Sequence, residues 1–142
     1  MIGFGSLAID RASLRFVALF ALGLACLGSV FEAAPTVFQQ LYMLPVSHLS
    51  TALLQAVTVD AILDTSHLGD GFCELAVSRI LYRITFDCTG IFAVLAFTSL
   101  TLAYPATWQH KASGLALGLP AIFAFSVLRI AVLGVVATIE PD

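Results

Sequence analysis

The chain has 142 residues, which is enough for one compact unit, and its composition is that of a membrane protein. Hydrophobic residues make up 60% of it and charged residues 11%, and the mean hydropathy is +1.02. Soluble domains have about 25% charged residues. The composition therefore excludes an ordinary soluble fold and predicts a single integral membrane domain over residues 1–142. A net charge of −3 without a cluster of Lys or Arg argues against nucleic-acid binding.

Three apolar stretches predict transmembrane helices at about residues 14–34, 90–108 and 113–138. Crossing a hydrocarbon core of about 30 Å takes about 20 residues, which each stretch approaches or reaches. The first stretch follows basic residues and therefore also resembles a signal peptide, although it contains no clear A-x-A cleavage site. These stretches predict a mainly α, polytopic membrane protein with about three spans.

The segment between the first two stretches, about residues 35–88, is expected to lie outside the membrane. Within it, residues 46–59 have an apolar stripe at helical spacing, which predicts an amphipathic helix on the membrane surface, with a weak further span as the alternative. Gly69-Asp70-Gly71 predicts a turn. Residues 72–86 are rich in β-branched and aromatic residues, which predicts one or two strands in a short β-hairpin-like segment.

Basic residues near the helix ends predict the orientation, because cytoplasmic loops carry an excess of Lys and Arg. Arg11 and Arg15 place the N-terminus in the cytoplasm, and Lys111 places the last loop there too. Residues 35–88 and the C-terminus then face the outside.

Cys88 is the strongest candidate for chemistry. It stands in Asp87-Cys88-Thr89-Gly90, directly before the second apolar stretch. Free N–H groups at a helix start favour a thiolate and an oxyanion, and Gly90 would allow a substrate backbone to approach closely. Two other interpretations remain open, a half-buried residue at a loop–helix junction and a disulfide with Cys73. The spacings of the three cysteines match no metal motif, and we expect neither a metal nor a cofactor.

Arg129 is the second candidate, because it is the one charge inside the last apolar stretch. Such a charge costs about 2.5–3.5 kcal/mol on insertion scales, so it indicates a function unless the side chain reaches the interface. With the helix taken to end near Ile139, Arg129 is expected roughly 15 Å below the outer surface. Antiparallel neighbouring helices would bring Cys88 and Arg129 to the same side of the membrane.

Cys88-Thr89-Gly90 at a helix start, followed by Ser126-Val127-Leu128-Arg129-Ile130 in the next helix, resembles the exosortase/archaeosortase family. The resemblance covers about residues 71–136. It implies a membrane cysteine transpeptidase or protease that cleaves exported proteins at C-terminal sorting signals, at the outer face of the bacterial inner membrane. Cys88 and Arg129 would be catalytic, with Thr89, Gly90 and Ser126 supporting the substrate or the oxyanion. Its partners would be those exported proteins and the lipid bilayer.

The chain departs from the family pattern at three places. Thr89 and Ser126 stand where Ser and Asn are usual, and residues 130–142 do not include the later helix that carries a third catalytic residue. That group would come from an unseen helix, a partner subunit or His67. The alternative is a non-catalytic membrane scaffold or an inactive relative.

Overall fold

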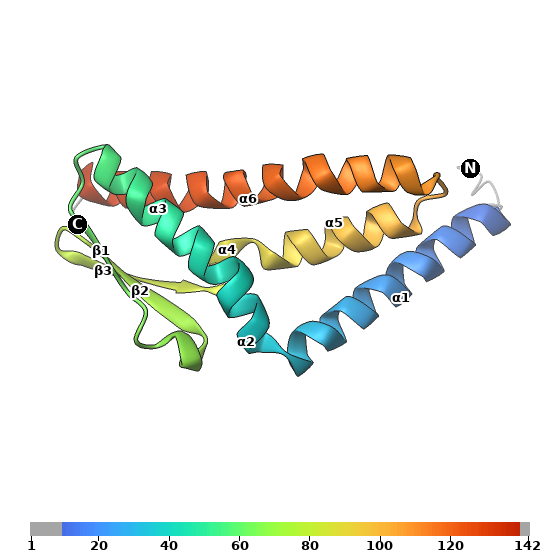
Figure 1. Cartoon of the computed structure of the whole chain (residues 1–142), viewed down its shortest axis with the longest axis horizontal. Coiled ribbons are helices and arrows are strands. Elements are labelled where there is room, and N and C mark those ends of the chain that lie inside the picture. The colour runs from blue at the N-terminus through green and yellow to red at the C-terminus, as the bar shows by residue number, and fades with distance from the viewer. Residues whose placement is uncertain (1–9, 140–142) are drawn as a thin grey trace, which may run out of the picture.

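The computed structural model describes residues 10–139, which form long helices and a small three-stranded sheet (Figure 1). The elements in chain order are α1 (Arg11–Ala33), α2 (Pro35–Phe38), the π-helix η1 (Gln39–Met43), α3 (Leu44–Ala56), β1 (Ala61–Asp64), the 3₁₀-helix η2 (Leu68–Asp70), β2 (Phe72–Val77), β3 (Ile80–Thr85), α4 (Phe86–Thr89), α5 (Ile91–Ala103) and α6 (Trp108–Ile139).

Two of the described helices, α1 and α6, are long and apolar enough to cross a membrane. The expected second span is shorter than predicted, because α5 has only 13 residues and ends at Ala103. The cause is Pro105, which disfavours helical backbone at the preceding residue, and Tyr104 is extended. The last helix begins earlier than predicted, at Trp108, so Lys111 lies in its first turn instead of in a loop.

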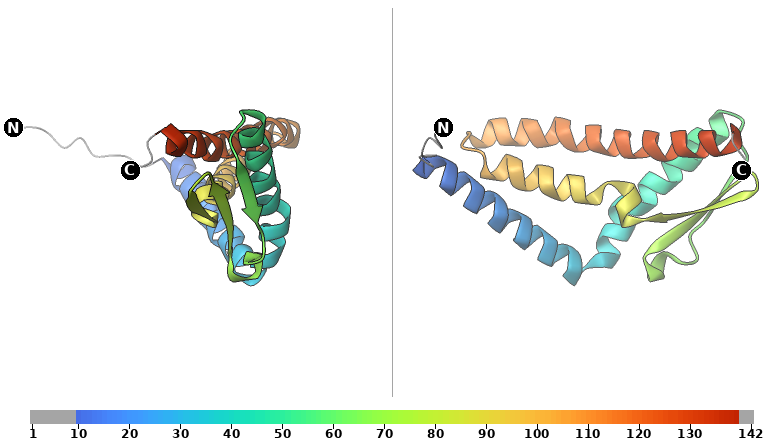
Figure 2. Two further views of the ribbon diagram at one scale, coloured as in Figure 1. Left: turned by 90° about the vertical axis from the view of Figure 1, so that its left-hand side faces the viewer. Right: turned by 180° about the vertical axis from the view of Figure 1, so that it is seen from behind.

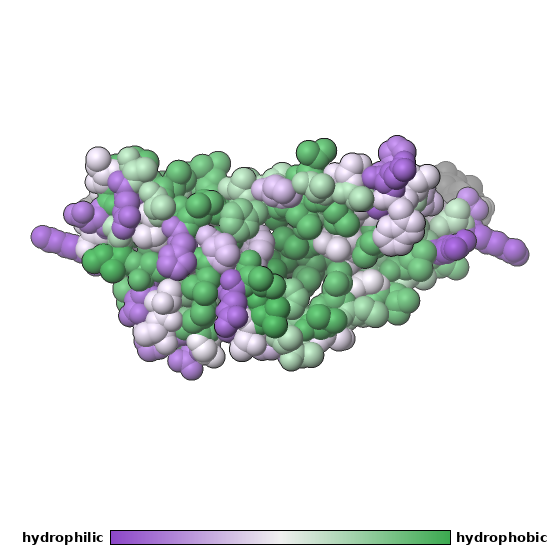
Figure 3. Space-filling model, in the orientation of Figure 1, coloured by the Kyte–Doolittle hydropathy of each residue, from purple (hydrophilic) through white to green (hydrophobic). Residues whose placement is uncertain are grey.

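The helices form an elongated molecule with its polar parts at the two ends. α1 and α6 begin at the same end, and α5 lies between them and runs back towards that end (Figure 2). The sheet and α3 gather at the opposite end, against the C-terminal half of α6. Hydrophilic residues concentrate towards both ends, with an apolar surface between them (Figure 3). This distribution matches a protein whose middle lies in lipid.

The predicted amphipathic helix exists as α3, and the face that it buries against the rest of the molecule is rich in small hydroxyl residues. Ser47, Ser50 and Thr51 are buried together with Val46 and Leu54. The apolar residues Leu49, Leu53 and Val57 are exposed. The buried face packs against α6. The Ser50 hydroxyl donates to the Val46 carbonyl within α3 at 2.7 Å and lies 3.4 Å from the carbonyl oxygen of Val127 on α6. Small hydroxyl residues permit close contact between helices in membranes, which explains the choice of face.

The expected hairpin is part of a three-stranded antiparallel sheet with the order β1-β2-β3. The predicted strand region became β2 and β3, and the turn at Gly69–Gly71 is confirmed, with Gly71 left-handed at φ 90°. The sequence analysis missed β1, because four residues with an aspartate at the end give little strand signal. One face of the sheet packs against the helices through buried residues: Ala61, Cys73, Leu75, Val77 and Ile84.

Candidate active site

Cys88 lies in α4, a one-turn helix between β3 and α5. The sequence analysis expected it directly at the start of the second membrane helix, but Gly90 is left-handed at φ 75° and separates α4 from α5. The Cys88 side chain is half-buried, and the Thr85 hydroxyl donates to its sulfur at 3.8 Å. The strand, the short helix and the glycine therefore fix the position of the thiol together.

The thiol opens onto a small groove of about 50 Å³ between the sheet and α6. Mostly apolar residues from β2, β3, α4 and α6 line this groove: Leu75, Tyr82, Arg83, Ile84, Cys88, Ile130, Leu133 and Gly134. The residues that α6 contributes begin with Ile130, directly after Arg129. The motif around Cys88 and the motif that ends at Ile130 therefore meet at this groove.

Ser126 and Gly90 pack the helix that carries Arg129 against the segment that carries Cys88. A Cβ placed on Gly90 would lie 2.7 Å from the Ser126 hydroxyl oxygen. Ser126 is buried and donates to the Ile122 carbonyl at 2.8 Å, and its oxygen lies 3.4 Å from the Tyr42 hydroxyl. The close approach at Gly90 is therefore made by α6, and Tyr42 of η1 is a supporting residue that the sequence analysis missed.

Arg129 directly precedes Ile130, which lines the groove, but Arg129 itself is not a lining residue. It lies on the exposed side of α6, whereas the buried side of this helix consists of Ser126, Val127, Ile130, Ala131 and Gly134. Its side chain is exposed, and within residues 10–139 it makes no ion pair and no hydrogen bond. A guanidinium in this position is free to bind a carbonyl oxyanion or a carboxylate.

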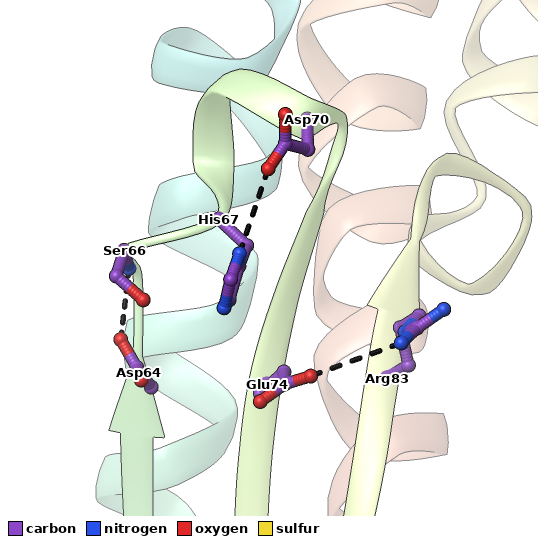
Figure 4. Close-up of polar contacts among 6 residues, drawn as sticks. All are labelled: Asp64, Ser66, His67, Asp70, Glu74 and Arg83. Carbon is purple, nitrogen blue, oxygen red and sulfur yellow. Dashed lines mark hydrogen bonds and ion pairs between the residues drawn. The ribbon is translucent and has the colours of Figure 1, made fainter.

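Arg83 of β3 is a cation in the same groove as Cys88, and it was not among the candidates singled out from the sequence. It lines the groove, lies 3.9 Å from a Glu74 carboxylate oxygen and stacks over the Phe72 ring at 4.3 Å (Figure 4). The signal that could have found it is its position five residues before Cys88, in the strand that leads into α4.

The remaining candidates occupy other positions. Thr89 is buried, and its hydroxyl donates to the Phe86 carbonyl at 2.8 Å, which stabilises α4 itself. His67 stacks on Phe72 with ring centroids 5.1 Å apart, and its Nδ1 lies 3.5 Å from Asp70 (Figure 4). It does not line the groove, and neither does any other histidine of the described residues.

The disulfide between Cys73 and Cys88 is absent, since all three cysteines are free. Cys73 is buried on β2, where its partner in the ladder is Ile84. Burial raises the pKa of the Cys73 thiol, and the nearby Ser47 hydroxyl offsets this only in part. Cys88 is therefore available as a free thiol, whereas Cys73 is an inert core residue.

Comparison with known families gives one match. The model of a family described as transmembrane exosortase matches residues 2–142. No curated protein and no solved structure matches the chain.

Proposed function

Because the chain belongs to the transmembrane exosortase family, a family of membrane transpeptidases and proteases, we propose that it is a cysteine peptidase or transpeptidase acting on C-terminal sorting signals of exported proteins. The observation that carries the proposal is the free Cys88 thiol, which lines a groove together with Ile130 of α6, the residue that follows Arg129. The partners are exported proteins whose signal combines a short motif, a transmembrane helix and a basic tail.

The chemistry follows from the groups at the groove. The Cys88 thiolate attacks a peptide carbonyl carbon, which forms a C–S bond and places the negative charge on the carbonyl oxygen. Arg129 stabilises this oxyanion or orients the substrate. The oxyanion then collapses and the C–N bond breaks. The leaving amine takes up a proton from water, which balances the proton that the Cys88 thiol gave up to form the thiolate. Water or an acceptor amine attacks the resulting thioester and releases the Cys88 thiol.

The length of α6 supports a site at the outer membrane interface. Its 32 residues extend about 48 Å, well beyond a hydrocarbon core of about 30 Å. With Trp108 at the inner interface, Arg129 lies about 32 Å along the helix, near the outer boundary. On this proposal Arg129 lies nearer the outer surface than the roughly 15 Å expected from the sequence, because α6 is taken to continue past the bilayer to its contacts with α3 and the sheet.

The same arrangement supports three crossings. Since α1 and α6 begin at the same end of the molecule, the chain has to return between them, and α5 is the segment that does so. Arg11, Arg15 and Lys111 mark that end as cytoplasmic. The groove then faces the outside of the inner membrane.

The proposal is tested by cleavage of a co-expressed reporter that ends in such a signal. We expect Cys88→Ala to abolish processing and Arg129→Ala to lower its rate at least a hundredfold, with Arg129→Lys between Arg129→Ala and the native chain. Cys26→Ala, on the exposed surface of α1, is the matched control and leaves processing unchanged.

Processing that survives Cys88→Ala would refute the cysteine mechanism. If the native chain leaves a panel of compatible reporters intact, the non-catalytic scaffold is the correct function.

A further inference from the structure

β3 is an edge strand that leads directly to Cys88. The sheet order leaves β3 with a neighbour on one side only, and α4 follows it without a loop. On the far edge, α3 packs against β1. Among residues 10–139, no strand pairs with the outer side of β3. Long, open edges are usually blocked by a proline, a bulge or a cover, because they pair readily with other strands.

The register shows which backbone groups face outward. The Ser78 N–H donates to the Asp60 carbonyl at 3.0 Å, so Ser78 bonds towards β1. Hydrogen-bonding direction alternates along an antiparallel strand, so Val77 and Leu75 bond towards β3, where they pair with Ile80 and Tyr82. The two-residue turn between Val77 and Ile80 leads to the same assignment, because the residues that flank such a turn form a hydrogen-bonded pair.

The N–H and C=O groups of Leu81 and Arg83 therefore point away from the sheet. No turn, cap or side-chain hydrogen bond among the described residues reaches the N–H of either residue. The side chains do not cover this edge, because Leu81 is 62% exposed and the Arg83 side chain 63%. In Figure 4, Arg83 is carried by the outermost strand of the sheet.

From this geometry we propose that the substrate binds as an added strand on the outer edge of β3. An extended peptide next to the exported protein's transmembrane helix pairs with Leu81 and Arg83, and the continuation of its backbone meets the Cys88 thiol just past the end of β3. Edge pairing supplies affinity through main-chain hydrogen bonds with little demand on sequence. The inference rests on the proposed peptidase function and specifies the conformation of its substrate.

Leu81→Pro tests the edge from the enzyme's side. Proline removes the outward N–H of residue 81 but no hydrogen bond to β2, so the sheet is retained. We expect Leu81→Pro to slow reporter cleavage about tenfold or more, since it leaves a peptide carbonyl without a donor. Leu81→Ala, the comparison variant at the same position, removes the side chain but keeps this N–H, so we expect it to cleave the reporter faster than Leu81→Pro does.

A photo-crosslinking amino acid at position 81 tests binding without catalysis. It is placed in the Cys88→Ala variant of the full chain, and crosslinking to the co-expressed reporter is measured. The control places the same group at Ile62, which is 72% exposed on β1. We expect crosslinks to the segment adjacent to the reporter's transmembrane helix from position 81 and not from position 62. This measurement also decides the matter if Leu81→Pro does not fold.

The outcomes separate the two proposals. Cleavage by the native chain with equal rates for Leu81→Pro and Leu81→Ala, or with no crosslink from position 81, overturns edge pairing and leaves the peptidase function in place. Crosslinks from position 81 without cleavage by the native chain support edge pairing and refute the peptidase function. Crosslinks from position 81 to a second copy of this chain would assign the edge to dimerisation and overturn the proposal.

Discussion

Gly90 is fixed by two independent constraints, and both bear on the position of Cys88. Its backbone is left-handed, a conformation that costs other residues roughly 1–2 kcal/mol. Its missing side chain also leaves room for the Ser126 hydroxyl, the nearest atom of α6. The family motif predicts a glycine two residues after the cysteine. The packing against Ser126 explains why this chain requires glycine at that position.

We therefore expect Gly90→Ala to destabilise the protein by about 2–4 kcal/mol and to lower reporter processing. The backbone strain of an alanine in the left-handed conformation adds to the steric overlap of its Cβ with the Ser126 hydroxyl. Replacing Ser126 by alanine in the same chain removes the overlap but not the strain. The double variant should recover part of the loss in thermal unfolding in detergent and part of the activity. Full recovery, or none, would contradict this account of Gly90.

Cys73 predicts a pH dependence of stability. Burial raises the pKa of its thiol in the folded state above the ordinary value of about 8.5. The buried thiol thus contributes stability that is fully present below about pH 8.5 and is lost as the pH rises through the folded-state pKa. We expect the free energy of unfolding in detergent to fall above about pH 8.5, and this part of the fall to vanish in Cys73→Val. An identical pH profile in the variant would contradict the assignment.

The contact between α3 and α6 is the element-level feature that holds the outer part of the molecule together. Gly134 of α6 lies against Leu54 of α3, and a Cβ on the glycine would come within 2.8 Å of a Leu54 methyl carbon. Since Leu54 is fully buried, it has no free space to move into. Gly134 also lines the groove beside Cys88, so a shift of α3 would change the site.

Gly134→Ala should therefore lower stability by about 1–3 kcal/mol, the usual range for overpacking. Gly28→Ala is a matched control, because Gly28 is also in a helix and a Cβ added there would meet no atom within 4 Å. That variant should be neutral or up to about 1 kcal/mol more stable, as alanine favours helix. Thermal unfolding of both variants in the same detergent measures the difference, and equal behaviour would contradict close packing at Gly134.

The sequence predicted the elements better than their contacts. The long apolar helices, the strand region of residues 72–86 and the turn at Gly69–Gly71 all carry strong local signals. The buried face of α3 could not be predicted, because small hydroxyl residues are buried only when a second helix approaches closely. Cys88 and Arg129 stood out in the sequence as chemically unusual residues. Arg83 belongs to the candidate site because β3 is the edge strand next to it. β3 has this position because β1 pairs on the other side of β2, and β1 was not predicted.

At the scale of the whole molecule, α6 relates the site to the membrane. It is the one described helix that runs from the end with Trp108 and Lys111 past Arg129 to the sheet. A bilayer centred on the apolar band of Figure 3 leaves the sheet, α3 and the groove on one side. For the proposed peptidase, we therefore expect the peptide bond to be cleaved to lie at the membrane boundary, where an extended segment leaving the lipid could reach the open edge of β3.

Labelling with a membrane-impermeant maleimide on intact cells tests this placement in single-cysteine variants. We expect Cys88 to react from outside, and Asp87→Cys, which is exposed beside it, to react faster. Cys26 should remain unlabelled because we expect α1 to cross the bilayer, and Gln109→Cys, at the start of α6, should react only after the cells are permeabilised. If Gln109→Cys reacted from outside while Asp87→Cys was protected, the orientation would be inverted and the substrate would have to be cleaved on the cytoplasmic side. Labelling of both from outside would mean that α6 does not cross the membrane, and the level of Arg129 would then need another explanation.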